Sequence, residues 1–231
     1  MSAAERGLPL RLVGGVAVAV RCPSAARSPL RREYADVDLV TLGRARDGVI
    51  ELMAELGYAG DREFNTLHGH RRLYFWDRGN ERQVDVFVDE AKLCHTIDFR
   101  PRVELEATTL PLADLLLMKL QVVETNEKDL LDVCALLTDH DLGTGQDAVD
   151  STYIAALASS DWGLWRTLVM VAERGEEFAL RLADFGAGDR VATRLRQLRQ
   201  ELEAAPKSRG WRMRARVGDR KRWYELPEEA H

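Results

Sequence analysis

Two short stretches decide the fold of this chain: Leu12-Val13-Gly14-Gly15-Val16-Ala17-Val18-Ala19-Val20 and Arg32-Glu33-Tyr34-Ala35-Asp36-Val37-Asp38-Leu39-Val40. The first places a glycine pair between an apolar start and a run of small apolar residues, as in a strand that passes into a helix. In the second, Asp36 and Asp38 are two positions apart, so on a strand both side chains point to one face. Gly14 and Gly15 have no Cβ that would obstruct a phosphate, and a helix starting there directs free N–H groups at an anion. The two stretches together predict a metal-dependent phosphate site on a strand.

A third carboxylate, Asp85, lies in the alternating stretch Arg82-Gln83-Val84-Asp85-Val86-Phe87-Val88-Asp89, which predicts another strand. A single carboxylate in an otherwise buried strand is costly unless a metal or an adjacent cation pairs with it. We therefore interpret Asp36, Asp38 and Asp85 as catalytic ligands of two Mg²⁺ ions, with a nucleoside triphosphate (NTP) bound across them.

Two other interpretations of the aspartate pair stay open. An Asp-x-Asp-x-Val sequence also begins the phosphatase site of the haloacid dehalogenases, but that site follows a long apolar strand. Here Arg31-Arg32-Glu33-Tyr34-Ala35 precedes the pair and the apolar residues come after it, which favours nucleotidyl transfer. The second alternative is a solvated strand end that carries two surface aspartates.

The glycine pair, the Asp-x-Asp and the later lone aspartate resemble the nucleotidyltransferase fold of the DNA polymerase beta superfamily. Within it, the chain is similar to small bacterial proteins grouped with the AbiEii-type toxins of toxin–antitoxin systems. Two later segments also look like that group: Ala113-Asp114-Leu115-Leu116-Leu117-Met118-Lys119-Leu120-Gln121 and Glu127-Lys128-Asp129-Leu130-Leu131-Asp132. The resemblance covers roughly residues 10 to 165.

This resemblance implies an α+β fold, with a nucleotidyltransferase-like mixed sheet flanked by helices and a C-terminal helical region. It implies transfer of a nucleoside monophosphate from an NTP to an RNA, protein or small-molecule acceptor, and a toxin role with an antitoxin among the partners. One departure is Tyr34, which occupies a position where a serine is common in the group. The alternative is a non-catalytic nucleotide- or RNA-binding module on the same fold.

We interpret Gly14, Gly15, Arg32 and Lys119 as nucleotide-binding residues. Arg32 approaches the carboxylate pair along the chain, where it binds a triphosphate or, in the other reading, forms a salt bridge to Glu33. Lys119 lies in an almost wholly apolar predicted helix, so its ammonium either reaches water or extends to the triphosphate. The resemblance favours the phosphate role.

The next predicted helix begins after Thr125 or Asn126 and carries a small polar group. Asp129 and Asp132 are three positions apart and share a helix face, with Lys128 beside them. We expect Lys128, Asp129 and Asp132 to orient the lysine helix or a neighbouring loop rather than to bind metal directly. Exposed polar surface is the alternative.

The remaining pattern predicts a helix over 44–56 and a hairpin in which 61–76 pairs with 83–88. His68 and His70 would share one face of the first hairpin strand, and 103–106 would form an edge strand. Several helices are expected between 151 and 204. We expect a nucleotidyltransferase-like core in residues 1–110, a helical region packed on it in 111–205 and a tail in 206–231.

That tail is rich in basic residues interleaved with Trp211, Trp223 and Tyr224. Such a pattern is typical of a segment that binds RNA through phosphates and stacked bases. A tail folded back onto an acidic body of the protein is the competing interpretation.

The composition limits the class of protein. The 231 residues are 45% hydrophobic and 31% charged, as in ordinary globular proteins, and the net charge of −5 argues against a uniformly basic nucleic-acid coat. Three widely spaced cysteines predict a reducing compartment without a disulfide or zinc framework. Because no segment approaches the ~18 apolar residues of a membrane span, we expect a cytoplasmic protein without a membrane partner.

Overall fold

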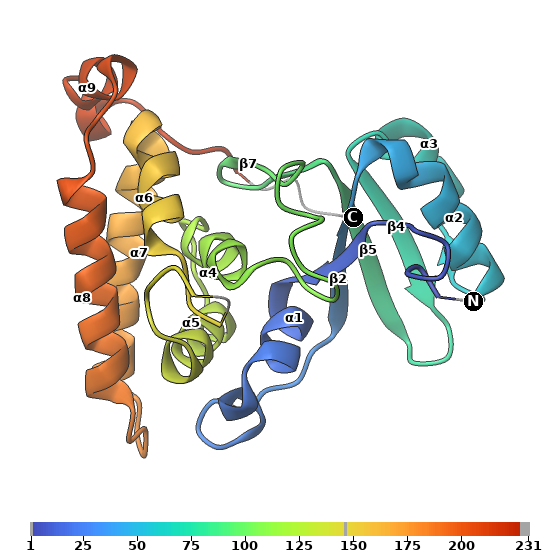
Figure 1. The fold of residues 1–231 in the computed structure, drawn as a ribbon, viewed down its shortest axis with the longest axis horizontal. Helices are drawn as coiled ribbons and strands as arrows, with labels where there is room; N and C mark the ends of the chain where they lie inside the picture. The colour runs from blue at the N-terminus through green and yellow to red at the C-terminus, as the bar shows by residue number, and fades with distance from the viewer. Residues whose placement is uncertain (1, 146, 227–231) are drawn as a thin grey trace. The chain divides into compact units, whose positions relative to one another are not determined.

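A computed structural model describes residues 2–145 and 147–226, which fall into two compact units (Figure 1). The first unit contains the chain up to Val20, Glu33–Lys92 and Thr96–Pro111, and the second contains Arg21–Arg32, Leu93–His95 and the chain from Leu112 onward. The second unit thus takes in two segments from the predicted 1–110 core, and also the described part of the predicted tail, 206–226. The last five positions of that tail, 227–231, lie outside the described residues.

Within the described residues, the first unit contains a five-stranded sheet with the order β1-β2-β5-β4-β3. The strands are β1 Leu10–Val13, β2 Asp36–Thr41, β3 Ala59–Gly60, β4 Arg72–Asp77 and β5 Arg82–Val88. Strands β2 and β5 are parallel and the other neighbours are antiparallel, so the sheet is mixed. A small sheet pairs β6 Glu90–Lys92 with β7 Thr96–Asp98. The predicted α+β class is confirmed.

The two faces of the five-stranded sheet differ in chemistry because strand residues alternate. One face forms a hydrophobic core with helix α2, Arg46–Glu55, through Val84, Val86, Val88, Leu73, Phe75, Val49 and Met53. Each such buried side chain contributes roughly 1.5–3 kcal/mol to stability. Alternation then assigns the opposite face to Asp36, Asp38, Gln83, Asp85, Arg72 and Tyr74. One face of the sheet therefore packs into a hydrophobic core, and the other face is polar.

The predicted hairpin forms only in part. β4 and β5 pair, and the Asp77 carboxylate accepts hydrogen bonds from the N–H groups of Gly79 and Asn80 in the turn. Residues 62–68, however, form helix α3, Arg62–His68, because the Asp61 side chain caps it by accepting from the N–H of Phe64. His68 therefore ends a helix and does not share a strand face with His70, and the predicted edge strand at 103–106 is a turn region.

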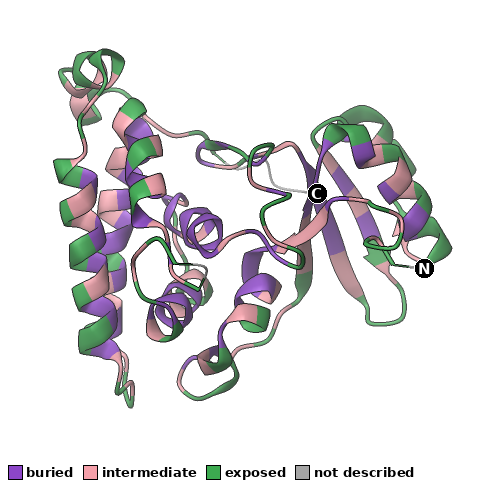
Figure 2. Cartoon of the chain, viewed as in Figure 1, coloured by how far each residue is buried: buried purple, intermediate pink, exposed green. Residues whose placement is uncertain are grey.

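The second unit is helical. Its helices are α4 Leu112–Leu120, α5 Glu127–Asp139, α6 Ser151–Ser160, α7 Trp162–Arg181, α8 Gly188–Ala204 and the short α9 Arg209–Ala215. The Asn126 side chain caps α5, as predicted, by accepting from the N–H of Asp129. Helix α4 is almost entirely buried (Figure 2), and α7 and α8 lie side by side (Figure 1). No helix in the described part of the chain combines the length and apolar character needed to cross a membrane.

Candidate active site

The first unit brings three predicted aspartates to one face of its sheet. Asp36 and Asp38 lie on β2, and Asp38 is directly opposite Asp85 on the parallel strand β5. Side chains opposite one another on neighbouring strands point to the same face, so all three carboxylates share it. Their burial differs: Asp36 is exposed, Asp38 is half-buried and Asp85 is 2% exposed. We refer to Asp36, Asp38 and Asp85 as the carboxylate face.

Asp85 is held by two neighbours on this face. Arg72 Nε donates to Asp85 Oδ1 at 2.7 Å, and Gln83 Nε2 donates to Asp85 Oδ2 at 2.6 Å. The Arg72 guanidinium also lies 5.5 Å from the centre of the Phe87 ring. A buried carboxylate needs a compensating charge, and the sequence pattern predicted either a metal or an adjacent cation beside Asp85. In the structure Arg72 is that cation.

The sequence interpretation missed Arg72 and Gln83. The hairpin turn offered a signal, because pairing Asp77 with Arg82 places Tyr74 opposite Asp85 and Arg72 opposite Phe87. Counting along the ladder from the turn would have placed an arginine next to the buried carboxylate.

Gly14 brings the start of helix α1, Gly14–Arg21, against the carboxylate face. Its φ of +70° is a left-handed conformation that favours glycine. A Cβ built on Gly14 would lie 2.1 Å from Asp38 Oδ2, so only glycine allows this close approach. The absence of a Cβ at Gly14 thus makes room for the Asp38 carboxylate, and phosphate binding by Gly14 and Gly15 stays a prediction.

A metal fits part of the carboxylate face. Asp36 and Asp38 offer oxygen ligands on one strand face beside the Gly14 backbone, which suits a hard cation such as Mg²⁺. Among the described residues, however, no group of three or more histidine, cysteine, aspartate or glutamate side chains is arranged to hold one ion. Asp85, predicted as a third ligand, is placed instead as the arginine-paired carboxylate beside the other two.

A second group of predicted residues lies in the second unit, where it forms a buried ionic cluster. Arg32 bridges Asp132 at two points, with Nε 2.9 Å from Oδ1 and Nη2 2.7 Å from Oδ2. Lys119 Nζ lies 2.9 Å from Asp129 Oδ1 and 2.9 Å from Asp132 Oδ2. We call Arg32, Lys119, Asp129 and Asp132 the ionic cluster.

The ionic cluster explains how a lysine is accommodated in the apolar helix α4. Burial lowers the pKa of Lys119, but the carboxylates of Asp132 and Asp129 outweigh it, so the pKa is raised and the ammonium stays charged. Neither sequence interpretation of Lys119 included these partners. Asp129 and Asp132 form ion pairs with Lys119, whereas Lys128 is exposed on α5 and is not a member of the cluster.

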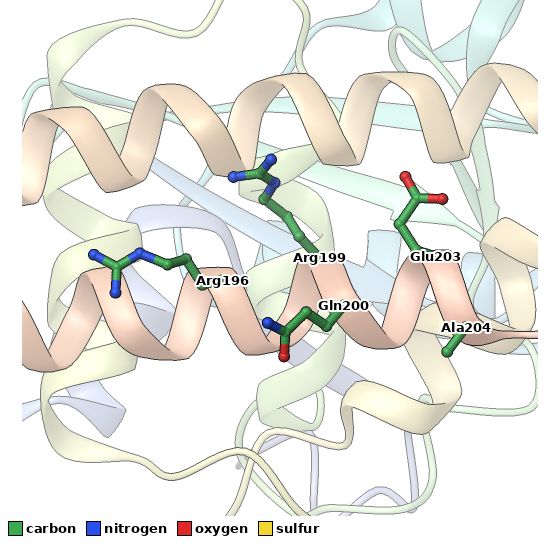
Figure 3. A pocket seen from close by; sticks show the side chains of 5 residues that line it. All are labelled: Arg196, Arg199, Gln200, Glu203 and Ala204. Atoms are coloured by element: carbon green, nitrogen blue, oxygen red, sulfur yellow. The ribbon is translucent and has the colours of Figure 1, made fainter.

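A pocket on α8 lies apart in sequence from all of these residues (Figure 3). It is lined by Arg196, Arg199, Gln200, Glu203 and Ala204. Arg199 is paired with Glu173 of α7 at 2.6 Å, and Arg196 is paired with Glu176 at 2.6 Å. Because these charges are already compensated between the two helices, we assign the pocket no role in the site.

The fold and site define an α+β protein whose mixed sheet carries a carboxylate face beside a glycine turn. No model of a known protein family matches the chain, and no curated protein matches it at a significant level. A solved structure of the lincosamide antibiotic adenylyltransferase LnuA, with lincomycin bound, is similar to 58% of this chain over 89% of its own length, with 14% identity and a TM-score of 0.42. The resemblance to the AbiEii-type group stays a prediction.

Proposed function

We propose that this protein is a metal-dependent nucleotidyltransferase, which moves a nucleoside monophosphate from an NTP to an acceptor. The observation that carries the proposal is the placement of Asp36 and Asp38 on one strand face, with the Gly14 turn packed against Asp38. Asp36 and Asp38 would hold a divalent cation. When bound, that cation supplies charge neutralisation on the triphosphate and activation of the acceptor hydroxyl.

The other groups on this face have supporting roles in the proposal. N–H groups of the first turn of α1 carry the positive end of the helix dipole, which suits a phosphate. In the reaction the acceptor hydroxyl loses its proton to water and its oxygen attacks the α-phosphorus, while the bond from that phosphorus to the bridging oxygen breaks and pyrophosphate leaves. Asp85 positions the Arg72 guanidinium at this face. The nucleotide-binding role of Arg32 stays a prediction from its position in the sequence, and the role of Lys119, the acceptor class and the toxin role stay predictions supported by the resemblance.

Labelled nucleotides provide the test. Each NTP, labelled in its α-phosphate, would be incubated with the protein, Mg²⁺ and total RNA or cell lysate, and the products separated. Asp36→Asn and Asp38→Asn should abolish the labelled product, while Asp47→Asn, at an exposed position on α2, should not. The proposal fails if Asp36→Asn and Asp38→Asn both keep more than about a tenth of the wild-type activity.

A specific observation favours a second candidate, a nucleotide-binding module without turnover. Both oxygens of Asp85 are hydrogen-bonded by Arg72 and Gln83, so this carboxylate is engaged within the protein and is not the open third metal ligand that the transfer reaction was expected to use. This candidate predicts Mg²⁺-dependent NTP binding by calorimetry with no labelled product from any acceptor preparation.

A further inference from the structure

The described part of the C-terminal segment, residues 207–226, is folded into the second unit. The Trp211 ring packs edge-on against Trp165 with centroids 5.1 Å apart, and Trp223 packs against Trp162 at 6.0 Å. Trp223 Nε1 also donates to Thr167 Oγ1 at 3.0 Å. Because Trp211 and Trp223 pack against tryptophans of α7 and are partly buried, their rings are less accessible for stacking on bases. Of the two interpretations of the tail, the folded-back one describes its aromatic residues.

Helix α9 has two faces with different surroundings. Trp211 and Arg214, three positions apart, face inward, and the Arg214 guanidinium lies 4.5 Å from the centre of the Trp162 ring. Arg209, Arg212 and Arg216 are spaced by three and four positions, so they share another face, and all three are exposed. The first and last of these arginines are seven positions apart, a span of about 10 Å along a helix.

Several residues after α9 are also positively charged. The exposed cations of the whole segment are Arg209, Arg212, Arg216, Arg220, Lys221 and Arg222, which we call the α9 basic surface. Asp219 is the only acidic residue in the sequence 207–224, and Arg166 of α7 binds it at 3.1 Å. Within the described part of the chain, Arg209, Arg212 and Arg216 form no ion pair. This concentration of positive charge stands out in a chain whose net charge is −5.

We propose that the α9 basic surface binds the phosphate backbone of a nucleic acid. Guanidinium groups match phosphate oxygens by forming two parallel hydrogen bonds, and a row of them follows a backbone better than a single anion. An anionic membrane is less well matched, because α9 is a seven-residue helix and its tryptophan, which would anchor at a lipid interface, is packed inward. Since the aromatic rings are occupied, the binding should depend on charge and not on base sequence.

The experiment measures fluorescence anisotropy of a labelled single-stranded RNA of mixed sequence with the full-length protein, at salt from roughly 50 to 200 mM. The variant is Arg209→Gln/Arg212→Gln/Arg216→Gln. With a slope of about −0.7 per phosphate contact, losing three contacts should make the log–log salt slope shallower by about 2 and weaken binding on the order of 100-fold at about 0.1 M salt. A matched control, Arg78→Gln/Arg181→Gln/Arg190→Gln, removes the same charge from exposed positions elsewhere and should keep the wild-type slope.

The proposal is overturned if the α9 variant binds RNA like the wild type, or if the control loses as much affinity. It is also overturned if the wild type binds vesicles that contain phosphatidylserine but does not bind RNA, and the α9 variant no longer binds those vesicles. Near-ultraviolet circular dichroism reports whether the tryptophan packing survives the substitutions. If the packing is lost in the α9 variant, a second variant, Arg220→Gln/Lys221→Gln, tests the proposal outside α9. It should make the log–log salt slope shallower by about 1.4.

The proposed surface is independent of the proposed reaction. RNA binding needs neither NTP nor metal, so Asp36→Asn and Asp38→Asn should bind RNA with wild-type affinity and slope. A failure of the proposed nucleotidyl transfer can therefore be distinguished from a failure of RNA binding by the α9 basic surface.

Discussion

Replacing Lys119 with methionine should lower the free energy of unfolding by about 3–5 kcal/mol, the typical cost of leaving a buried charge without its partner. The Lys119 ammonium lies 2.9 Å from an oxygen of Asp129 and 2.9 Å from an oxygen of Asp132. The three side chains are 12%, 17% and 2% exposed, so water would compensate little for the lost charge. Methionine keeps most of the apolar stem, and Arg32 would then be the remaining cation of the ionic cluster beside two carboxylates.

Urea unfolding followed by far-ultraviolet circular dichroism measures this loss. With an m-value of about 2–3 kcal/mol/M, the midpoint should fall by about 1–2.5 M. Arg181→Met serves as the control, because its pair with Glu177 is solvent-exposed and contributes less than about 0.5 kcal/mol. A second variant, Lys119→Met/Asp129→Asn, restores the charge balance and should recover about 1–2 kcal/mol. A midpoint for Lys119→Met within experimental error of the wild type would refute this account of the cluster.

Three further predictions concern the glycine turn, the held carboxylate and a buried histidine. Gly14→Ala should cost at least about 1–2 kcal/mol in thermal unfolding, because alanine resists the left-handed conformation and its methyl group would displace Asp38; an unchanged melting temperature would contradict it. Arg72→Met should cost about 3 kcal/mol by leaving Asp85 buried and unpaired, and Arg72→Met with Asp85→Asn should recover part of that loss; equal stability of the single variant and the wild type would argue against it. Burial lowers the pKa of His95 below the ordinary 6.5 despite nearby carboxylates, so the folded protein binds this proton less readily than the unfolded chain does. The contribution of His95 to the free energy of unfolding is therefore constant above pH 6.5, and stability falls as the pH drops from 6.5 through the lowered pKa. Melting curves at a series of pH values should show this fall in the wild type and a smaller one in His95→Gln, and parallel curves would contradict the prediction.

The sequence predicted the elements whose signal is local. The glycine pair after an apolar start marks where β1 passes into α1, and the alternation around Asp36 and Asp85 marks β2 and β5. Helix α3 was missed because its residues continue into the alternating pattern of β4. The deciding feature was the capping side chain of Asp61, which the strand interpretation did not weigh against the alternation.

Contacts between distant positions could not be predicted in this way. Arg32 and Asp132 are 100 positions apart, and nothing in either local pattern identifies the other as its partner. The sequence pattern did show that Lys119 and Asp85 were polar groups in apolar surroundings and therefore needed compensation. It could not show whether a ligand or another side chain supplied it, because that choice depends on how the helices and strands pack.

The burial of the carboxylate face separates the roles of its members. A carboxylate that is 2% exposed, as Asp85 is, must carry a permanent partner to be tolerated in the folded chain, and Arg72 is that partner. Asp36, which is exposed, has no such requirement, because water can solvate its charge. Asp38 lies between these extremes, held close to the backbone of Gly14 and directly opposite Asp85 in the sheet. In the proposed reaction Asp36 and Asp38 would therefore hold and release the cation, while the charges of Asp85 and Arg72 compensate each other beside them.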